Sequence, residues 1–242
     1  MCEHEIPCGE PERYKIDCDE RERLEDGANT DRPQLFELAN QVVASAPERR
    51  WDAVVSDAIR GILVGRFLTR ILLADANERG QSPPKLVHIA NSRSAYEGII
   101  YGGLSKPSRG HSRAITDYLK SMGFERALIA SDIVDTGKCL QKLGAAVIKA
   151  GIIPDFAILA SAHKPTTLRR KMHVTRRSEI YAVTTGVEPM LAQSMITQGL
   201  GVQTIYGMAE PQPSSAPWPW IGEVAYELYD QLADEYIQDH IR

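Results

Sequence analysis

The sequence contains few cysteines and no long apolar run. Its 242 residues include four cysteines, too few for the disulfide framework of a small secreted domain. Cys2, Cys8 and Cys18 lie near the start with His4, but their spacings fit none of the usual paired zinc-binding patterns, so we interpret them as reduced thiols. No stretch approaches the roughly 18 apolar residues of a membrane span, and the polar start lacks the apolar region of a signal peptide. We therefore expect a cytoplasmic protein without a membrane partner.

A large excess of charge of one sign is also absent. The chain has 28 Lys and Arg against 32 Asp and Glu, which gives a formal net charge of −4. This balance gives no reason to expect nucleic acid or an anionic membrane as a partner. Acidic residues are concentrated in residues 1–32, where apolar residues are sparse and show no clear period. We interpret this region as a polar N-terminal extension, either a disordered tail or a loose flap.

From residue 33 onward, apolar runs of strand length alternate with segments of helix length. Helices are expected over 33–46, 61–76 and 112–122, after the segment 132–139 up to about 150, from Pro189, and over 222–241. Strands are expected over 53–55, 85–90, 127–130, 156–160, 180–183 and 202–206, and residues 211–219 are expected to form a proline-rich link. This alternation predicts an α/β fold whose mostly parallel, twisted sheet is flanked by helices on both faces.

The carboxyl ends of parallel strands meet at one edge of a sheet, where ligands of such folds bind. The loops after Val55, Ala90, Ala130 and Ala160 should therefore converge on one site. One of these loops is unusually long. It covers residues 91–112, and a loop of that length in a compact domain is usually functional or disordered.

The segment from Ala127 to Leu140 is the most informative part of the sequence. A buried strand leads into a turn with two carboxylates, Asp132 and Asp135, and then into a helix start. The first amides of a helix lack partners within the helix and point outward at the positive end of its dipole, so they can bind a phosphate. The two carboxylates would repel a bare phosphate, and we expect them to bind ribose hydroxyls, directly or through Mg²⁺. The segment lacks the first glycine of the ATP-binding P-loop, which excludes that motif.

These residues resemble the phosphoribosyl-pyrophosphate (PRPP) motif of the type I phosphoribosyltransferases, especially of the purine branch. The family motif has four apolar residues, two acidic residues, two apolar residues and then Asp-Thr-Gly-Lys-Thr. The resemblance implies that Ser131 and Asp132 orient the ribose of PRPP and that Asp132 also holds the metal. It places Asp135 beside the reacting carbon and the base. It also implies that the 5-phosphate binds Asp135, Thr136, Gly137, Lys138 and Cys139. Ser131 stands where the family has an acid, and Cys139 stands where it has Thr or Ser.

Two further loops resemble parts of that family. Ser56-Asp57-Ala58-Ile59-Arg60-Gly61 is similar to the pyrophosphate loop, in which Arg60 and Gly61 would bind the leaving group. The long loop after the second strand corresponds to the mobile loop that closes over PRPP. Ser94 and Tyr96 loosely match its Ser–Tyr pair, with Ala95 inserted between them. Closure of such a loop excludes water and prevents hydrolysis of PRPP.

The base-binding residues are implied by two shorter matches. Ser161-Ala162-His163-Lys164-Pro165 resembles the strand end at which purine enzymes place a lysine on the 6-oxygen of the base, and Lys164 is the candidate. Trp218 and Trp220 lie in a segment similar to the Pro-Trp segment of xanthine-type members, where an aromatic ring stacks on the base. Both tryptophans could equally cover the core.

The resemblance covers roughly residues 35–165 and implies a type I phosphoribosyltransferase-like core over residues 33–165. Residues 166–242 would then form a small hood and a C-terminal helix packed on that core, although 166–212 match no pattern. The implied activity is transfer of the 5-phosphoribosyl group from PRPP to a nucleobase, a 6-oxopurine, with Mg²⁺ as cofactor. The implied assembly is a homodimer. Two alternatives remain open: a regulator that senses PRPP or a nucleotide, and an enzyme for orotate or a specialised base.

Overall fold

The computed structural model describes the backbone of residues 11–57, 61–89, 109–134, 137–161, 163–172, 174–184, 200–205, 208–213 and 220–241. Within these ranges the side chains of 11–20, 57, 109–112, 171, 184, 200–213 and 220–223 are not described. The elements in chain order are α1 (Pro11–Arg49), β1 (Ala53–Asp57), α2 (Ile62–Glu78), β2 (Lys85–Ile89), α4 (Arg109–Ser121), β3 (Arg126–Val134), α5 (Lys138–Lys149), β4 (Ile153–Ser161), α6 (Pro165–Met172), β5 (Ile180–Thr184), β6 (Leu200–Ile205), β7 (Met208–Pro213) and α8 (Trp220–His240).

The predicted α/β fold is confirmed. The sheet has the strand order β5-β4-β3-β1-β2-β7-β6, in which β1 to β5 run parallel and β7 and β6 are antiparallel additions beyond β2. Strands β3 and β4 lie inside the parallel part and are buried along nearly their whole length. A central parallel strand is covered on both faces, which explains why the sequences of β3 and β4 are almost continuously apolar.

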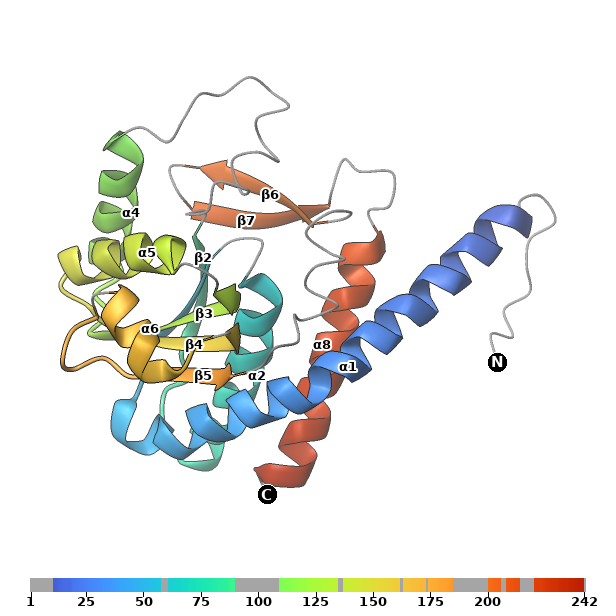
Figure 1. Cartoon of the computed structure of the whole chain (residues 1–242), viewed down its shortest axis with the longest axis horizontal. Coiled ribbons are helices and arrows are strands. Elements are labelled where there is room, and N and C mark those ends of the chain that lie inside the picture. Colours follow the sequence, from blue (N-terminus) through green and yellow to red (C-terminus); the bar gives the residue numbers. More distant parts are fainter. Residues whose placement is uncertain are drawn as a thin grey trace.

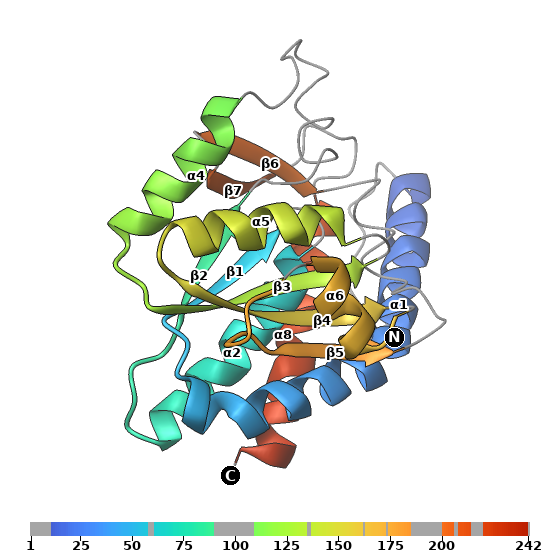
Figure 2. The same ribbon diagram turned by 60° about the vertical axis from the view of Figure 1, so that its left-hand side comes forward.

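Two apolar cores lie on opposite faces of the sheet. The first joins α1, α2 and α8 to one face, where Val54, Leu128 and Leu159 alternate with residues that point the other way. The second joins α4, α5 and α6 to the opposite face through Val55, Ile129 and related positions. Figure 1 and Figure 2 show the sheet between these two groups of helices, with the tips of β3, β4 and β5 pointing toward α1 and α8 in Figure 1.

Helix α1 contradicts the interpretation of residues 11–32 as a tail or flap. It is one helix of 39 residues, and Pro33 and Pro47, which the sequence suggested as its start and stop, both lie inside it. Leu24, Ala28 and Asp31 form a narrow buried stripe at helical spacing. This stripe has too few apolar residues to show a helical period in the sequence. Packing against α8, which lies nearly 200 residues away in the chain, stabilises this part of α1.

Helix α8 agrees with the predicted closing helix and is attached to α2 by two bidentate ion pairs. Arg66 donates to both oxygens of Asp230 at 2.8 and 2.6 Å, and Arg70 does the same to Asp234 at 2.6 and 2.7 Å. Bidentate geometry makes these pairs stronger than ordinary surface pairs. In Figure 1 helix α1 crosses α8, and its N-terminal part extends beyond α8, away from the sheet.

Other boundaries also differ from the sequence-based prediction. Residues 211–213, expected in a proline-rich link, belong to β7, which pairs with β6 from Leu200↔Pro213 to Ile205↔Met208. Helix α6 was not predicted at all. The expected helix from Pro189 and the N-terminal Cys2, His4 and Cys8 lie outside the described residues. Among the helices in the described ranges, none has both the length and the apolar character needed to cross a bilayer.

Candidate functional site

The candidate site lies where the strand order reverses. Strand β1 has β2 on one side and β3 on the other, with Ser56 level with His88 and with Ala130. Strand β2 therefore lies on one side of β1, and β3, β4 and β5 follow one another on the other side. Ligands of open parallel sheets bind outside the carboxyl ends of the strands at such a switch point. Strand β1 ends at Asp57, one residue past Ser56, and β3 continues past Ala130 through Ser131 and Asp132. The loop with the predicted pyrophosphate segment therefore begins beside the part of β3 that carries these two residues of the PRPP motif.

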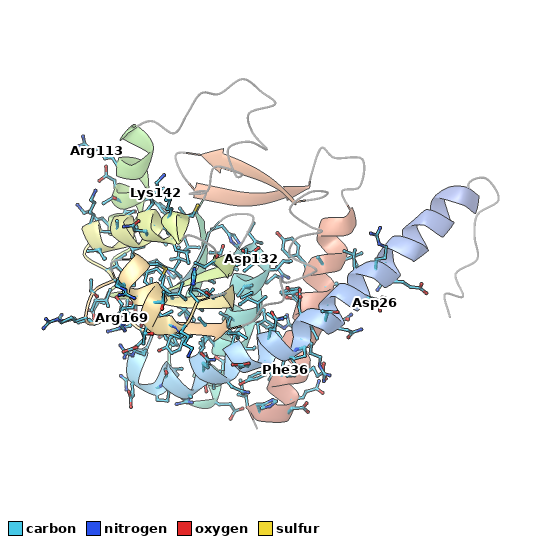
Figure 3. The ribbon with its side chains drawn as sticks, viewed as in Figure 1. Asp26, Phe36, Arg113, Asp132, Lys142 and Arg169 are labelled. Atoms are coloured by element: carbon cyan, nitrogen blue, oxygen red, sulfur yellow. The ribbon has the colours of Figure 1, made fainter. Side chains whose placement is uncertain are left out.

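Strand β3 is longer than predicted and contains the two positions of the motif that are acidic in the family. Ser131 and Asp132 lie within it, at 2% and 1% exposure. The Asp132 carboxylate accepts a hydrogen bond from the backbone N–H of Ile133 at 2.6 Å. Figure 3 shows Asp132 near the end of β3, on the side of the sheet covered by α2 and α8. A ligand that binds Asp132 would replace groups that now cover it.

The start of α5 has the features of a phosphate cradle. Gly137 precedes the helix at φ 74° and ψ 0°, and its carbonyl accepts the first helical hydrogen bond, from Gln141 at 2.8 Å. The amides of residues 138 to 140 precede that bond and lie at the positive end of the helix dipole. Lys138 and Cys139 are exposed there, and the first turn carries no acidic residue. Asp135 and Thr136 lie outside the described residues.

Two features favour glycine at position 137, its positive φ and its closeness to α6. A Cβ at this position would lie 3.1 Å from Cγ of Met172. We expect Gly137→Ala to lower the free energy of unfolding by about 1–2 kcal/mol, since a left-handed conformation is costly for a residue with a Cβ. Gly80→Ala is the matched control, because Gly80 also has a positive φ but has nothing within 4 Å of its Cβ position. Urea denaturation measures the loss of unfolding free energy in both variants. Equal losses in Gly137→Ala and Gly80→Ala would show that the contact with Met172 does not contribute.

The predicted pyrophosphate loop joins β1 to α2. Gly61 is the N-cap of α2 and accepts a hydrogen bond from the N–H of Gly65 at 2.7 Å, whereas Arg60 lies outside the described residues. Gly65 lets α2 lie directly on the sheet, because a Cβ there would come within 2.9 Å of Cβ of Ser56 and 3.7 Å of Cβ of Ala130. The N-terminus of α2 is thereby fixed over the switch point.

A Ser–His pair beside the switch point was not anticipated from the sequence. Oγ of Ser56 lies 2.5 Å from Nδ1 of His88, across the parallel pairing of β1 and β2. Burial, with a smaller effect of the nearby Arg66 guanidinium, lowers the pKa of His88 from 6.5 to about 4. His88 is therefore neutral at pH 7. The only signal in the sequence was a polar residue in an apolar strand, and the register that brings Ser56 to it is set by the sheet.

The lowered pKa of His88 makes stability depend on pH with a definite sign. The unfolded chain binds the proton more tightly than the folded chain, so stability is lost as the pH falls through 6.5 toward 4. Between pH 7.5 and pH 5 this histidine should account for about 2 kcal/mol of lost unfolding free energy. Urea denaturation at both pH values should show that His88→Gln loses correspondingly less than the wild type. Identical losses in the two proteins would contradict the assignment.

Helices α1 and α8 supply a buried polar group near Asp132. The hydroxyl of Tyr229 donates a hydrogen bond to Asp31 at 3.3 Å, and both side chains are fully buried. Burial, followed by the negative charges of Asp31 and Asp132, raises the pKa of the Tyr229 hydroxyl well above its usual value. No local sequence pattern indicated this group, because Asp31 and Tyr229 are each about 100 residues from β3 along the chain.

Lys164 lies on the same edge of the sheet as the start of α5. Strand β4 ends at Ser161, level with Val134 of β3, and Ser161 exchanges hydrogen bonds of 3.0 Å with the backbone of His163. Lys164 is exposed immediately before α6, whose Met172 contacts the Gly137 position. The other residues implied for the base and the mobile loop are not placed: Ser94, Tyr96 and Trp218 lie outside the described residues, as does the side chain of Trp220 at the start of α8.

Asp132 is the one carboxylate of the predicted motif that lies within the described residues. Within the described residues, no group of three or more His, Cys, Asp and Glu side chains could hold a metal by itself. Mg²⁺ commonly binds one or two carboxylates and completes its shell with water and substrate phosphates. Asp132 could provide one such carboxylate.

No protein-family model matches the chain, and no curated protein gives a significant match.

Proposed function

We propose that the chain is an Mg²⁺-dependent phosphoribosyltransferase that transfers the 5-phosphoribosyl group of PRPP to a nucleobase. The observation that carries the proposal is the position of the PRPP-like segment. It begins next to the pyrophosphate-like loop, at the switch point of a parallel sheet, and leads into a helix N-terminus preceded by a glycine with positive φ. Such a position suits a ligand with a phosphate at one end and a pyrophosphate at the other.

In the proposed reaction a ring nitrogen of the base attacks the anomeric carbon of PRPP. The bond from that carbon to the pyrophosphate oxygen breaks, the electron pair leaves with pyrophosphate, and the base loses its ring proton. The amides of residues 138–140 would hold the 5-phosphate, and Asp132, already desolvated, would bind a ribose hydroxyl strongly. Mg²⁺ bound between Asp132 and the substrate would neutralise charge on pyrophosphate. Most of the rate enhancement would come from positioning and charge stabilisation.

The residues implied for the remaining roles complete the proposal. Arg60 would neutralise the leaving pyrophosphate, and Asp135 would take or stabilise the proton of the base. Lys164, exposed on the same edge of the sheet, favours a base with a 6-oxo group over one without. The proposed acceptor is therefore a 6-oxopurine.

A PRPP-sensing regulator is the second candidate. It is favoured by Ser131 and Cys139, which replace an acid and a hydroxyl of the motif, and by the burial of Asp132 at 1% exposure. These features weaken catalysis more than they weaken phosphate binding by backbone amides. Fold alone does not separate a sensor from an enzyme.

Pyrophosphate release distinguishes these candidates. The protein is incubated with PRPP, Mg²⁺ and a panel of oxopurine, aminopurine and pyrimidine bases, and PRPP binding is measured separately by calorimetry. Release of pyrophosphate with hypoxanthine, guanine or xanthine supports the proposal. Release only with orotate or another base would show a phosphoribosyltransferase with a different acceptor. Binding of PRPP without release by any base would favour the sensor. Absence of PRPP binding would overturn both.

A further inference from the structure

A cavity lies at the opposite edge of the sheet from the candidate site. It has a volume of about 480 Å³ and is formed by the loops that precede β1, β2 and β3. The ends of α1 and α2 that lead into two of these loops lie together at the lower left of Figure 1, away from the tips of β3, β4 and β5. Its volume is in the range of pockets that bind small molecules, roughly 300–1,000 Å³.

Two cations without partners line this cavity. Within the described residues, no carboxylate or other acceptor pairs with the side chain of Arg50 or Lys85. The neighbouring Arg49 differs, because it binds Glu179 at 3.0 Å. Arg50 and Lys85 are both exposed and both line the cavity, so two positive charges without a partner among the described residues stand at its wall.

The one carboxylate in the cavity wall is already engaged. Oδ2 of Asp52 accepts the backbone N–H of Glu125 at 2.7 Å and that of Arg126 at 3.0 Å. These two hydrogen bonds attach the loop before β3 to the loop before β1. Asp52 is thus a structural part of the wall, and the charge that it offers to a ligand is partly offset by the two amides.

The backbone conformation of Arg50 is a second observation that points to a ligand site in this cavity. Arg50 follows the last residue of α1 and has φ 47°, and it is the only residue other than glycine with a positive φ in the described part of the chain. Glycine is usual at this position after a helix, because it adopts the left-handed conformation without steric cost. A strained residue that is kept in a cavity wall points to a role for its side chain.

The remaining wall combines apolar and polar side chains. Trp51, Pro83 and Phe124 line it, with Gln81 and Ser82 as polar neighbours. The ring of Trp51 is held in place by its N–H, which donates to Asp155 at 2.8 Å, so the ring is not free to rotate into the cavity.

We propose that this cavity binds a small molecule that carries an anionic group on a flat, largely apolar ring. Arg50 and Lys85 bind the anion, and the ring lies against Phe124 and Pro83. The site is formed by residues at the amino ends of the strands, so it does not depend on the function proposed for the carboxyl ends.

The fluorescent probe anilinonaphthalene sulfonate has this chemistry, and its titration into the full-length protein tests the proposal. We expect saturable binding by the wild type. Loss of one charge-assisted contact should weaken the affinity about tenfold in Arg50→Gly and in Lys85→Gln. Arg50→Gly is the sharper variant, because glycine adopts the positive φ without strain. Its melting temperature should therefore stay the same or rise while its affinity for the probe falls.

Two controls separate the cavity from general binding of the dye. Lys149→Gln removes an exposed lysine outside the cavity and should leave the affinity unchanged. The uncharged analogue phenylnaphthylamine should bind at least about tenfold more weakly, because it lacks the group that the two cations recognise. The proposal is overturned if the wild type shows no saturable binding, if Arg50→Gly and Lys85→Gln bind like the wild type, or if the uncharged analogue binds equally well.

Discussion

Replacement of Asp155 by Asn should lower the free energy of unfolding by about 3–5 kcal/mol, the usual loss when one partner of a buried ion pair is removed. Asp155 is fully buried and accepts three hydrogen bonds: from Nε1 of Trp51 at 2.8 Å, from the Arg126 guanidinium at 2.8 Å and from the backbone N–H of Glu179 at 2.6 Å. The side chain of Arg126 is only 18% exposed. An asparagine has one acceptor oxygen, so donors would be left unpaired and the cation would lose its counter-charge.

The matched control for this substitution is Asp117→Asn in α4. Asp117 pairs with Arg113 at 3.6 Å, but both side chains are exposed, at 61% and 85%. Such a pair contributes about 0–1 kcal/mol, so the control should unfold close to the wild type. Urea denaturation of the three proteins at pH 7 measures both effects. A loss below about 1 kcal/mol for Asp155→Asn would show that the Asp155 network does not hold β3, β4 and β5 together.

Asp132→Asn should weaken PRPP binding by about 10–100-fold while the protein stays folded. The substitution keeps the shape of the side chain but removes the charge that strengthens hydrogen bonds to ribose hydroxyls and attracts Mg²⁺. The effect is expected to be large because Asp132 is 1% exposed, and a hydrogen bond is stronger in a desolvated site than in water. Calorimetric titration with PRPP and Mg²⁺ measures the affinity, and thermal denaturation verifies the fold.

Asp31→Asn provides the control for Asp132→Asn. Asp31 is also a buried carboxylate close to Tyr229, but it lies on α1 and not at the end of a strand. If Asp132 contacts the ligand, Asp31→Asn should leave the PRPP affinity within about threefold, a difference below 1 kcal/mol. Equal losses in the two variants would mean that Asp132 acts only through the buried charge shared with Tyr229. An unchanged affinity in Asp132→Asn would remove Asp132 from the proposed site.

The Asp132 result also bears on the choice between enzyme and sensor. Both candidates require PRPP binding at this edge of the sheet, so both predict a weaker affinity. Only an enzyme loses pyrophosphate release as well. Ser131 is a poor place to restore an acid as a test, because it is 2% exposed and a carboxylate there would be buried.

The order of strands and helices was determined by sequence patterns that act over a few residues. Apolar runs such as 127–130 and 156–160 predicted β3 and β4, and the amphipathic period of 222–241 predicted α8. The start of α5 was also predictable, because a glycine before a helix requires only local backbone geometry. The expectation that the loops after β1, β2, β3 and β4 share one edge follows from the parallel alternation alone, and the pairing of these strands confirms it.

Features that depend on contacts between distant residues could not be predicted in this way. The sequence indicated a break at Pro33, but α1 continues through it because Leu24, Ala28 and Asp31 pack against α8. The free energy of that packing exceeds the cost of one proline and several polar residues inside a helix.

What the sequence by itself determined is therefore the α/β fold and the strand–turn–helix that ends at Gly137, since both are encoded within short segments. The tertiary structure alone decided which face of β3 carries Asp132, that His88 meets Ser56, and that Arg50 and Lys85 line one cavity. The physical reason is that side-chain direction, strand register and the meeting of loops are fixed by packing between segments far apart in the chain, where local preferences carry no information.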